Sequence, residues 1–276
     1  MTTVESNLTH GADAPAAPAT ESGLRIALAG KGGAGKTTVS ATLSRLLARR
    51  GHPVLVIDGD SNPNVAVALG VSQADAAAIP PLPLGLVSRR LDGPALKDPV
   101  SSIVERFGTT APDGVSVVHM AMPAHADEGC LCSSHATVSA ILADTGRTRE
   151  SVTVLDLEAS PENFSRGTTR HVDALLFVVE PYYRSLETAR RMGVLAAELE
   201  LDRVWVVANK LRSPGDIEAI DEFFGNHNLH VAAYVPWGDS VLDADKEGTP
   251  LLDFDPEGPV VAAISQLADR LVSPAA

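Results

Sequence analysis

The segment that most constrains the fold of this chain is a stretch rich in glycine and lysine at residues 30–38, GKGGAGKTT. It fits the phosphate-binding loop pattern G-x-x-x-x-G-K-[ST], in which glycines let the backbone curl so that successive N–H groups face phosphate oxygens. Lys36 is expected to reach the β- and γ-phosphates, and the hydroxyl of Thr37 to ligate Mg²⁺. The expected phosphate contacts are Gly32, Gly33, Ala34, Gly35, Lys36, Thr37 and Thr38.

The residues on either side of this loop supply the context that the motif requires. Before it, the apolar run 24–29 (LRIALA) predicts a buried strand that leads into the loop. After it, Val39, Leu43, Leu46 and Leu47 recur at helical spacing, so we expect a helix to begin at the loop and offer its N-terminus to an anion. Strand, loop and helix in this order favour a phosphate site over a chance match in a glycine-rich turn.

The whole chain alternates between strand-like and helix-like segments. Most strand-like segments are continuous runs of Val, Leu, Ile and Ala, which is typical of parallel strands covered on both faces. The pattern predicts an α/β fold with a doubly wound, mostly parallel sheet whose ligands lie at the carboxyl ends of the strands. Strands are expected at 24–29, 53–58, 115–120, 152–157, 174–179, 204–209 and 231–235, and helices at 36–50, 135–146, 184–199, 215–226 and 258–272.

Composition sets the domain organisation and excludes some partners. Residues 23–276 are expected to form one phosphate-loop domain, with an irregular, Pro-rich insertion near 72–114 that holds short helices. Residues 1–22 are rich in Ala, Thr, Pro and Glu and lack the apolar core of a secretory signal, so they predict a disordered tail. No apolar run is long enough to span a bilayer. The net charge of −13 argues against a general affinity for nucleic acid or anionic membranes.

Two carboxylate-bearing segments follow apolar strands. The second strand ends in Asp58-Gly59-Asp60, which places two carboxylates at the strand end near the phosphate loop, and another strand ends with Asp156. Carboxylates so close to a triphosphate would repel it unless a cation or a proton transfer involves them. We therefore assign Asp58 and Asp156 to water-mediated contacts with Mg²⁺, and Asp60 to positioning or deprotonating the attacking water. The alternative for the first pair is a polar strand end before an Asn-Pro turn.

The only two cysteines, Cys130 and Cys132, form a C-x-C just before a helical pattern. A position at a helix N-terminus favours the thiolate, which is the metal-binding form. One C-x-C supplies half of a four-ligand site, and a two-fold dimer would bring four sulfurs together. The alternatives are two incidental small residues or a redox pair. Cysteines so few and so close make no disulfide framework, which favours the cytoplasm. For His135 we favour a surface histidine over an accessory ligand.

A second lysine in the loop, Lys31, gives the chain a family resemblance. The sequence K-G-G-x-G-K-T-T resembles the deviant phosphate loop of the MinD-like (SIMIBI) class of P-loop NTPases, which includes MinD, ParA and the nitrogenase iron protein. The resemblance implies that Lys31 reaches across a homodimer interface to the partner's nucleotide; otherwise it is a solvated loop lysine. It also supports the roles of Asp58 and Asp60, because the class carries D-x-D there.

The resemblance also implies where the base of the nucleotide binds. In this class the Asn of an Asn-Lys pair contacts the base, which points to Asn209 and Lys210, and Pro236 is expected to border the same pocket. The alternative for Asn209 is a turn at the strand end.

The C-x-C, together with the segments at 156–159, 166–168, 172–181 and 184–189, narrows this resemblance to the CooC-type nickel-insertion ATPases that mature carbon monoxide dehydrogenase. It implies ATP and Mg²⁺ as cofactors, Ni²⁺ or Zn²⁺ at an intersubunit site of Cys130 and Cys132, and a client metalloenzyme. Ser160 departs from the glycine that the wider class has there. The alternatives are a metal-independent ParA/MinD-type switch and an iron–sulfur reductase component that resembles the nitrogenase iron protein.

Overall fold

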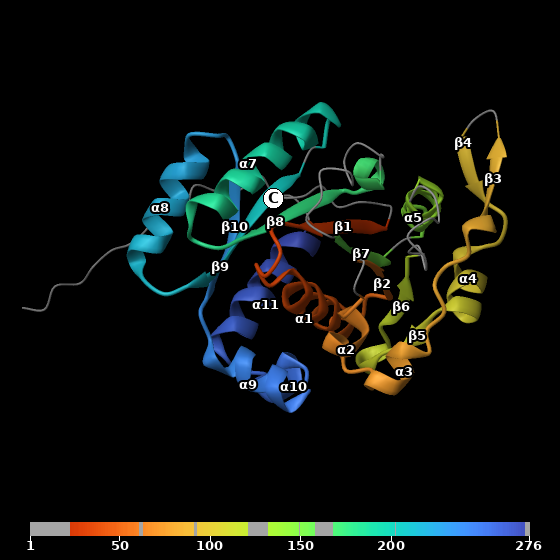
Figure 1. The fold of residues 1–276 in the computed structure, drawn as a ribbon, viewed down its shortest axis with the longest axis horizontal. Helices are drawn as coiled ribbons and strands as arrows, with labels where there is room; N and C mark the ends of the chain where they lie inside the picture. Colours follow the sequence, from red (N-terminus) through yellow and green to blue (C-terminus); the bar gives the residue numbers. More distant parts are fainter. Residues whose placement is uncertain are drawn as a thin grey trace, which may run out of the picture.

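The computed structural model describes residues 23–60, 63–90, 93–120, 132–148, 150–157, 168–201 and 203–273, and an eight-stranded sheet runs through it (Figure 1). The strand order is β10-β9-β8-β1-β7-β2-β6-β5, and neighbours are parallel except for β5 and β6. The predicted doubly wound α/β fold is confirmed. The strands of this sheet are β1 (Leu24–Ala29), β2 (Val54–Gly59), β5 (Thr109–Thr110), β6 (Ser116–His119), β7 (Val152–Leu157), β8 (Ala174–Val179), β9 (Val204–Leu211) and β10 (His230–Pro236).

Alternate residues of β1 point to opposite faces of the sheet, and each face carries its own helical layer. Ile26 and Leu28 belong to an apolar cluster with helices α1 (Lys36–Arg49) and α11 (Pro259–Val272). Ala27 and Ala29 belong to a second cluster with α5 (Cys132–Thr145), α7 (Tyr183–Glu198) and α8 (Pro214–Gly225). Figure 1 shows α1 and α11 on one side of the sheet and α7 and α8 on the other. Burial on both faces explains why the strand sequences are continuous apolar runs.

Strand β1 lies in the middle of the sheet, hydrogen-bonded to β7 on one side and β8 on the other. After β1 the chain places β2, β5 and β6 on one side and returns to insert β7 between β1 and β2. It then builds the other side outward from β8 to β10, so the strand order reverses direction beside β1. A reversal of this kind leaves a crevice at the carboxyl ends of the central strands, which is where ligands bind in doubly wound folds. The loop at residues 30–35 opens at this point, directly after β1.

Several short elements are present that the sequence pattern did not predict. The segment 72–114 holds the expected short helices, α3 (Gln73–Ala77) and α4 (Val100–Phe107), but also an antiparallel hairpin of β3 (Val87–Arg90) and β4 (Gly93–Leu96) and the edge strand β5. The unpredicted helices α2 (Val65–Leu69), α9 (Asp239–Glu247) and α10 (Leu251–Phe254) lie on the α1 side of the sheet. The 3₁₀ helices are η1 (Leu84–Leu86), η2 (Pro112–Gly114) and η3 (Thr168–His171).

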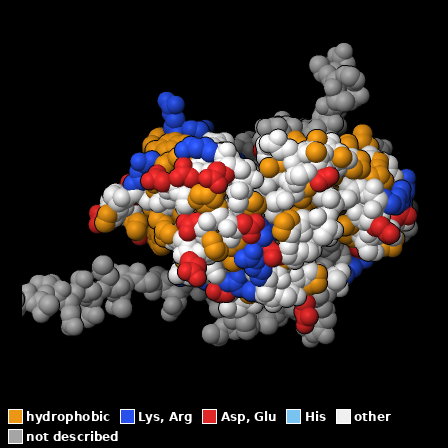
Figure 2. Space-filling view, turned by 90° about the horizontal axis from the view of Figure 1, so that it is seen from below, with side chains coloured by type: hydrophobic (Ala, Val, Ile, Leu, Met, Phe, Trp, Pro, Cys, Tyr) orange, Lys and Arg blue, Asp and Glu red, His pale blue; other side chains and the backbone are white. Residues whose placement is uncertain are grey.

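Acidic and basic side chains alternate on the face of the molecule seen from below, where Figure 2 shows them interspersed rather than gathered by sign. A cluster of ion pairs joins Arg45 and Arg49 of α1 to Asp113 and Asp253, with Arg45 Nε donating to an Asp113 oxygen at 2.6 Å. It ties α1 to η2 and α10. Among the described residues, no helix combines the length and apolar character that a membrane span needs.

Candidate functional site

The phosphate loop connects β1 to α1. At two positions of this loop only glycine fits the backbone conformation and the space available. Gly30 (φ 146°) and Gly35 (φ 93°) both lie in the left-handed region. A Cβ on Gly30 would collide with the carbonyl oxygen of Val178, and one on Gly35 with the side-chain amide of Asn209. Gly35 is also the N-cap residue of α1, and neither a side-chain cap nor an acidic residue occupies the first turn. The N–H groups of that turn are therefore available to an anion.

Lys36 and Thr37 are the first two residues of α1, directly after the loop. The side chain of Lys36 is buried, and its Nζ donates to the Lys31 carbonyl oxygen at 3.4 Å, so its ammonium group lies over the loop. The hydroxyl of Thr37 donates to Asp156 Oδ2 at 2.9 Å. This bond joins the start of α1 to the end of β7, and so brings two of the predicted Mg²⁺ ligands into contact.

The two strand-end aspartates of the predicted Mg²⁺ site are neighbours in the sheet. Asp58 of β2 and Asp156 of β7 are paired in register, and both are almost fully buried. Asp58 accepts hydrogen bonds from the backbone N–H groups of Asp60 (3.1 Å) and Val65 (3.0 Å). Burial nevertheless raises the pKa of Asp58 to about 6.

The buried carboxylate of Asp156 has fewer hydrogen-bond donors to stabilise its negative charge than that of Asp58. Burial, reinforced by the charge of Asp58, raises the pKa of Asp156 to about 7. Within the described part of the chain, its Oδ1 atom has no hydrogen-bond partner. A buried carboxylate oxygen without a donor, next to a threonine hydroxyl and a second carboxylate, suits a hydrated divalent cation. The residues present therefore fit Mg²⁺ bound at Thr37, Asp58 and Asp156.

The strand end of β9 holds the phosphate loop from the side. Asn209 is buried; its Nδ2 donates to the Ala34 carbonyl at 2.7 Å, and its Oδ1 accepts from the Lys210 backbone N–H at 2.9 Å. Each amide atom keeps one further hydrogen-bonding position, so base contact by Asn209 stays a prediction. Lys210 has a left-handed φ of 62°, and its Nζ donates to the Gly33 carbonyl at 2.5 Å.

A polar network beside the loop holds Lys31, and the sequence patterns gave no site role to two of its members, Glu180 and Tyr182. Lys31 Nζ donates to the Tyr182 hydroxyl at 3.4 Å and lies 4.9 Å from the centre of the tyrosine ring. The hydroxyl in turn donates to Glu180 Oε2 at 2.9 Å, while Lys210 Nζ lies 3.0 Å from Glu180 Oε1. Glu180 thus connects both loop-contacting lysines.

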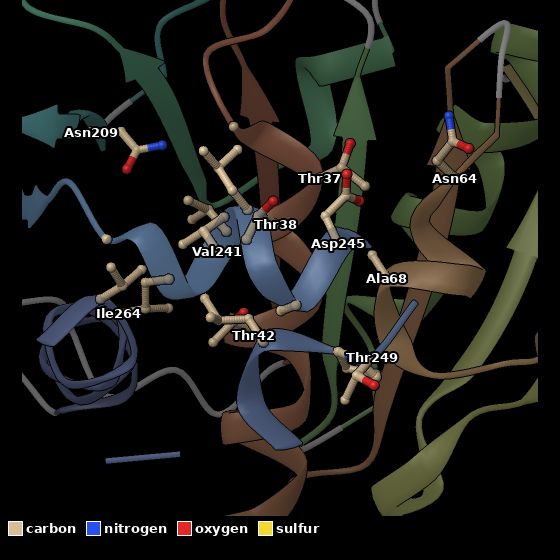
Figure 3. Close-up of a pocket in the computed structure, with 18 of the residues that line it drawn as sticks. Thr37, Thr38, Thr42, Asn64, Ala68, Asn209, Val241, Asp245, Thr249 and Ile264 are labelled. Atoms are coloured by element: carbon tan, nitrogen blue, oxygen red, sulfur yellow. The ribbon is translucent and has the colours of Figure 1, made fainter. Parts of the chain in front are cut away.

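A cleft of about 580 Å³ extends from the phosphate loop between α1, α9 and α11. Figure 3 shows Asn209 and Thr37 in the upper part of the view, with Val241, Asp245 and Thr249 below them. Pro236 borders the cleft as predicted, at the end of β10. Trp237 and most of the α9 side were missed, although Trp237 directly follows Pro236. Its ring lies 3.8 Å from the Arg212 guanidinium.

The cysteine motif falls largely outside the described residues. Cys130, the segment 158–167 with Ser160, and the side chain of Cys132 are not described, but helix α5 begins at Cys132. Among the described residues, no three His, Cys, Asp or Glu side chains form a metal site. The interpretation of His135 as a surface histidine was wrong. It is buried, because it lies on the inward stripe of α5 with Val138 and Leu142.

Comparisons with known proteins agree with this geometry. Residues 26–251 match the family described as the CobQ/CobB/MinD/ParA nucleotide binding domain. The chain is 34% identical over 242 residues to the carbon monoxide dehydrogenase accessory protein CooC of Rhodospirillum rubrum, covering 84% of this chain and 91% of that protein. It is 30% identical over 241 residues to an uncharacterised ATP-binding protein of Methanocaldococcus jannaschii, covering 83% and 91%. The MinD cell division protein of Aquifex aeolicus shares the fold, with a TM-score of 0.65 at 20% identity over 90% of this chain and 96% of that one. The chain therefore belongs to the CobQ/CobB/MinD/ParA family of nucleotide-binding domains and is a P-loop ATPase of the MinD/ParA type.

Proposed function

We propose that this protein is a dimeric ATPase that binds a transition metal between its subunits and assists metal insertion into a client enzyme such as carbon monoxide dehydrogenase. The observation that carries the proposal is the 34% identity to a carbon monoxide dehydrogenase accessory protein over 84% of the chain. The C-x-C of Cys130 and Cys132 gives that similarity a chemical basis. We expect the protein to act in the cytoplasm, where such thiols stay reduced.

The geometry of the strand ends supports Mg²⁺-dependent hydrolysis. Thr37, Asp58 and Asp156 would hold the ion, which when bound neutralises phosphate charge. Asp60 follows β2 and is only half-buried, so its carboxylate lies at the edge of the buried pair. That position suits a residue that orients or deprotonates the attacking water.

The setting of Lys31 supports a role between subunits. Its ammonium group is turned toward Tyr182 on the outer side of the loop, whereas that of Lys36 lies over the loop. Tyr182 and its neighbour Tyr183 are 40% and 69% exposed, so two adjacent aromatic side chains next to Lys31 are open to a partner. In the proposed dimer this surface meets its two-fold mate, and Lys31 contacts the partner's nucleotide.

The proposed metal site needs both subunits. Two thiolates from one C-x-C leave a divalent ion short of ligands, and a two-fold axis supplies the other two. Binding should therefore saturate at one Ni²⁺ or Zn²⁺ per dimer. Zn²⁺ should compete with Ni²⁺, because thiolates suit both ions and geometry must choose between them. Closing of the dimer by ATP should tighten metal binding, and metal should favour closing in return.

The test is a Zn²⁺ or Ni²⁺ titration of the full chain, with sedimentation to count subunits. Cys130→Ser and Cys132→Ser should each lose tight metal binding and keep ATP binding, while Ser133→Ala, beside the motif, should behave as wild type. One metal per monomer, or unchanged affinity in the cysteine variants, would remove the intersubunit site and leave a metal-independent switch ATPase. Visible absorption from an iron–sulfur cluster in anaerobically purified protein would instead indicate a reductase component.

A further inference from the structure

The side chain of Lys31 rests on two residues that directly follow β8. Its Nζ donates to the Tyr182 hydroxyl at 3.4 Å and lies 4.9 Å from the centre of the tyrosine ring. The hydroxyl donates in turn to Glu180 Oε2 at 2.9 Å, which leaves the lone pairs of its oxygen to the ammonium group. Lys210 Nζ lies 3.0 Å from Glu180 Oε1 and donates to the Gly33 carbonyl. A continuous path of polar contacts therefore leaves the loop at Lys31 and returns to it at Gly33.

The backbone that carries Tyr182 is fixed by its own hydrogen bonds. The Tyr182 N–H donates to the Glu180 carbonyl at 2.8 Å, and the Glu180 N–H donates to the hydroxyl of the buried Ser185 at 3.0 Å. Tyr182 is also the N-cap residue of α7, whose Leu186 packs into the core. The tyrosine is therefore held in place beside the loop, whereas the four-carbon stem of Lys31 is flexible on its own.

These two residues lie on the side of β1 away from the predicted Mg²⁺ ligands. The strand order places β8 and β9 on one side of β1, and β7 and β2 on the other. Tyr182 and Glu180 follow β8, whereas Asp156 lies near the end of β7. Lys36 is buried, with its ammonium group over the loop. The loop thus carries one lysine at its own phosphate site and a second, Lys31, that is drawn toward β8.

The ammonium group of Lys31 keeps hydrogen-bonding capacity while it contacts Tyr182. A lysine ammonium has three N–H donors, and among the described residues the Tyr182 hydroxyl accepts from one of them. Two donors therefore remain for phosphate oxygens. The carboxylate of Glu180 balances only one of the two lysines, so the cluster of Lys31, Lys210 and Glu180 keeps a net positive charge. Tyr182 is partly exposed, so the ammonium group stands where a second subunit can reach it.

We propose that Tyr182 is a positioning residue, which keeps Lys31 off the nucleotide of its own subunit and presents it to the nucleotide of the partner. Without this contact, a triphosphate bound at the same loop would be the closest polyanion, and Lys31 would turn to it. The contact with Tyr182 is retained when the dimer closes, because the ammonium group binds phosphate with its remaining donors. This inference rests on the proposed function, because it presumes a dimer in which Lys31 contacts the partner's nucleotide.

The chain offers a graded pair of variants and a matched control. Tyr182→Phe removes the hydroxyl and keeps the ring, whereas Tyr182→Leu removes both and keeps an apolar side chain. Tyr234 is exposed to nearly the same extent, 39% against 40%, and its hydroxyl also donates to a carboxylate, Asp221 Oδ1, at 2.5 Å. It belongs to β10, which β8 and β9 separate from β1. Tyr234→Phe and Tyr234→Leu therefore control for the loss of an exposed tyrosine elsewhere.

The first measurement is the affinity of the full chain for a non-hydrolysable ATP analogue with Mg²⁺, at protein concentrations too low for dimers. The exposed contact between a cation and an aromatic ring corresponds to about a two- to fivefold preference. Tyr182→Leu should therefore bind the analogue about two- to fivefold more tightly than wild type, because Lys31 then reaches the phosphates of its own subunit. Tyr182→Phe should lie between the two, and the Tyr234 variants should match wild type. In a Lys31→Ala background, Tyr182→Leu should bring no gain.

The second measurement is the dissociation constant of the dimer, obtained by sedimentation with saturating analogue and Mg²⁺. Two copies of Lys31 act in each dimer, so the effect of Tyr182 counts twice. Tyr182→Leu should therefore weaken the dimer about 5- to 30-fold, while the Tyr234 variants dimerise as wild type does.

The outcomes distinguish this inference from the proposed function. A wild type that stays monomeric with the analogue would overturn the proposed dimer, and the inference with it. A wild type that dimerises, with an equal or tighter dimer in Tyr182→Leu, would overturn the inference alone. Unchanged analogue affinity of the Tyr182→Leu monomer would make Tyr182 an interface residue only, and weaker affinity would make it a support of the loop. Either result would refute its role in positioning Lys31, as would a gain that persists in the Lys31→Ala background.

Discussion

Replacing Asp156 by Asn should stabilise the nucleotide-free protein, and increasingly so as the pH rises. Asn has the shape of the protonated carboxyl but cannot ionise. The pKa of Asp156 is raised from 3.8 to about 7, mainly by burial. At about 1.4 kcal/mol per pH unit, that change corresponds to about 4 kcal/mol between the neutral and the ionised form.

The direction of this pKa change decides how the stability of the wild type depends on pH. A carboxyl whose pKa is higher in the folded than in the unfolded state contributes stability below pH 4, and that stability is lost as the pH rises from about 4 to about 7. Above that window the wild type carries the full cost of the buried charge. The free energy of unfolding of Asp156→Asn should exceed that of wild type by up to about 4 kcal/mol at pH 8, and by about 2 kcal/mol less at pH 5.5.

The assay is urea unfolding of both proteins between about pH 5.5 and 8.5, in EDTA and without nucleotide. Asp245→Asn, an exposed aspartate of the same cleft, controls for the change in net charge. Adding Mg²⁺ and ATP should reverse the order, because the ion needs the ionised carboxylate and Asn cannot supply it. A stability difference between wild type and Asp156→Asn that stays constant over this pH range would refute the reasoning.

Three further substitutions probe the loop and its surroundings. Lys36→Ala should abolish ATP binding measured by equilibrium dialysis, because no other side chain could take its place over the loop. Near-normal ATP hydrolysis in this variant would show that residues 30–38 are not the phosphate-binding loop. Asp60→Asn should bind ATP but hydrolyse it about 10²–10⁴-fold more slowly and accumulate a dimer, whereas full turnover would move the role of general base elsewhere. Asn209→Ala should lower the free energy of unfolding by about 2–4 kcal/mol, because it leaves the Ala34 carbonyl and the Lys210 N–H without their buried partner. An unchanged urea midpoint would show that these hydrogen bonds do not stabilise the loop against β9.

The sequence was most informative where one physical requirement dominates a long segment. Strands buried on both faces must be continuously apolar, so β1, β7 and β8 were predicted from their apolar runs, with the bounds that the structure has. Gly30 and Gly35 made the loop recognisable in the sequence, because the left-handed backbone and the close packing at these two positions exclude other residues.

Other features depend on packing that no local pattern records. Helix α9 is nine residues long with only three apolar side chains, and α10 is a single turn, so neither is long enough for an apolar repeat to stand out in the sequence. Strand β5 has two residues and exists only because β6 lies beside it. The burial of His135 follows from which side of α5 meets the sheet. The periodicity of that helix did not decide this side, because Ser, Ala and Thr occupy most of its positions.

The phosphate loop is held by β9 before any nucleotide arrives. Lys210 and Asn209 tie the carbonyls of Gly33 and Ala34 toward β9. In a trans peptide the C=O and the following N–H point in opposite directions, so the tied Ala34 carbonyl aims the N–H of Gly35 away from β9. Fixing the backbone of one residue costs about 1–2 kcal/mol of entropy. Here that cost falls on folding of the chain and not on association with ATP, so the affinity of the loop for phosphate depends in part on the hydrogen bonds that tie the loop to β9.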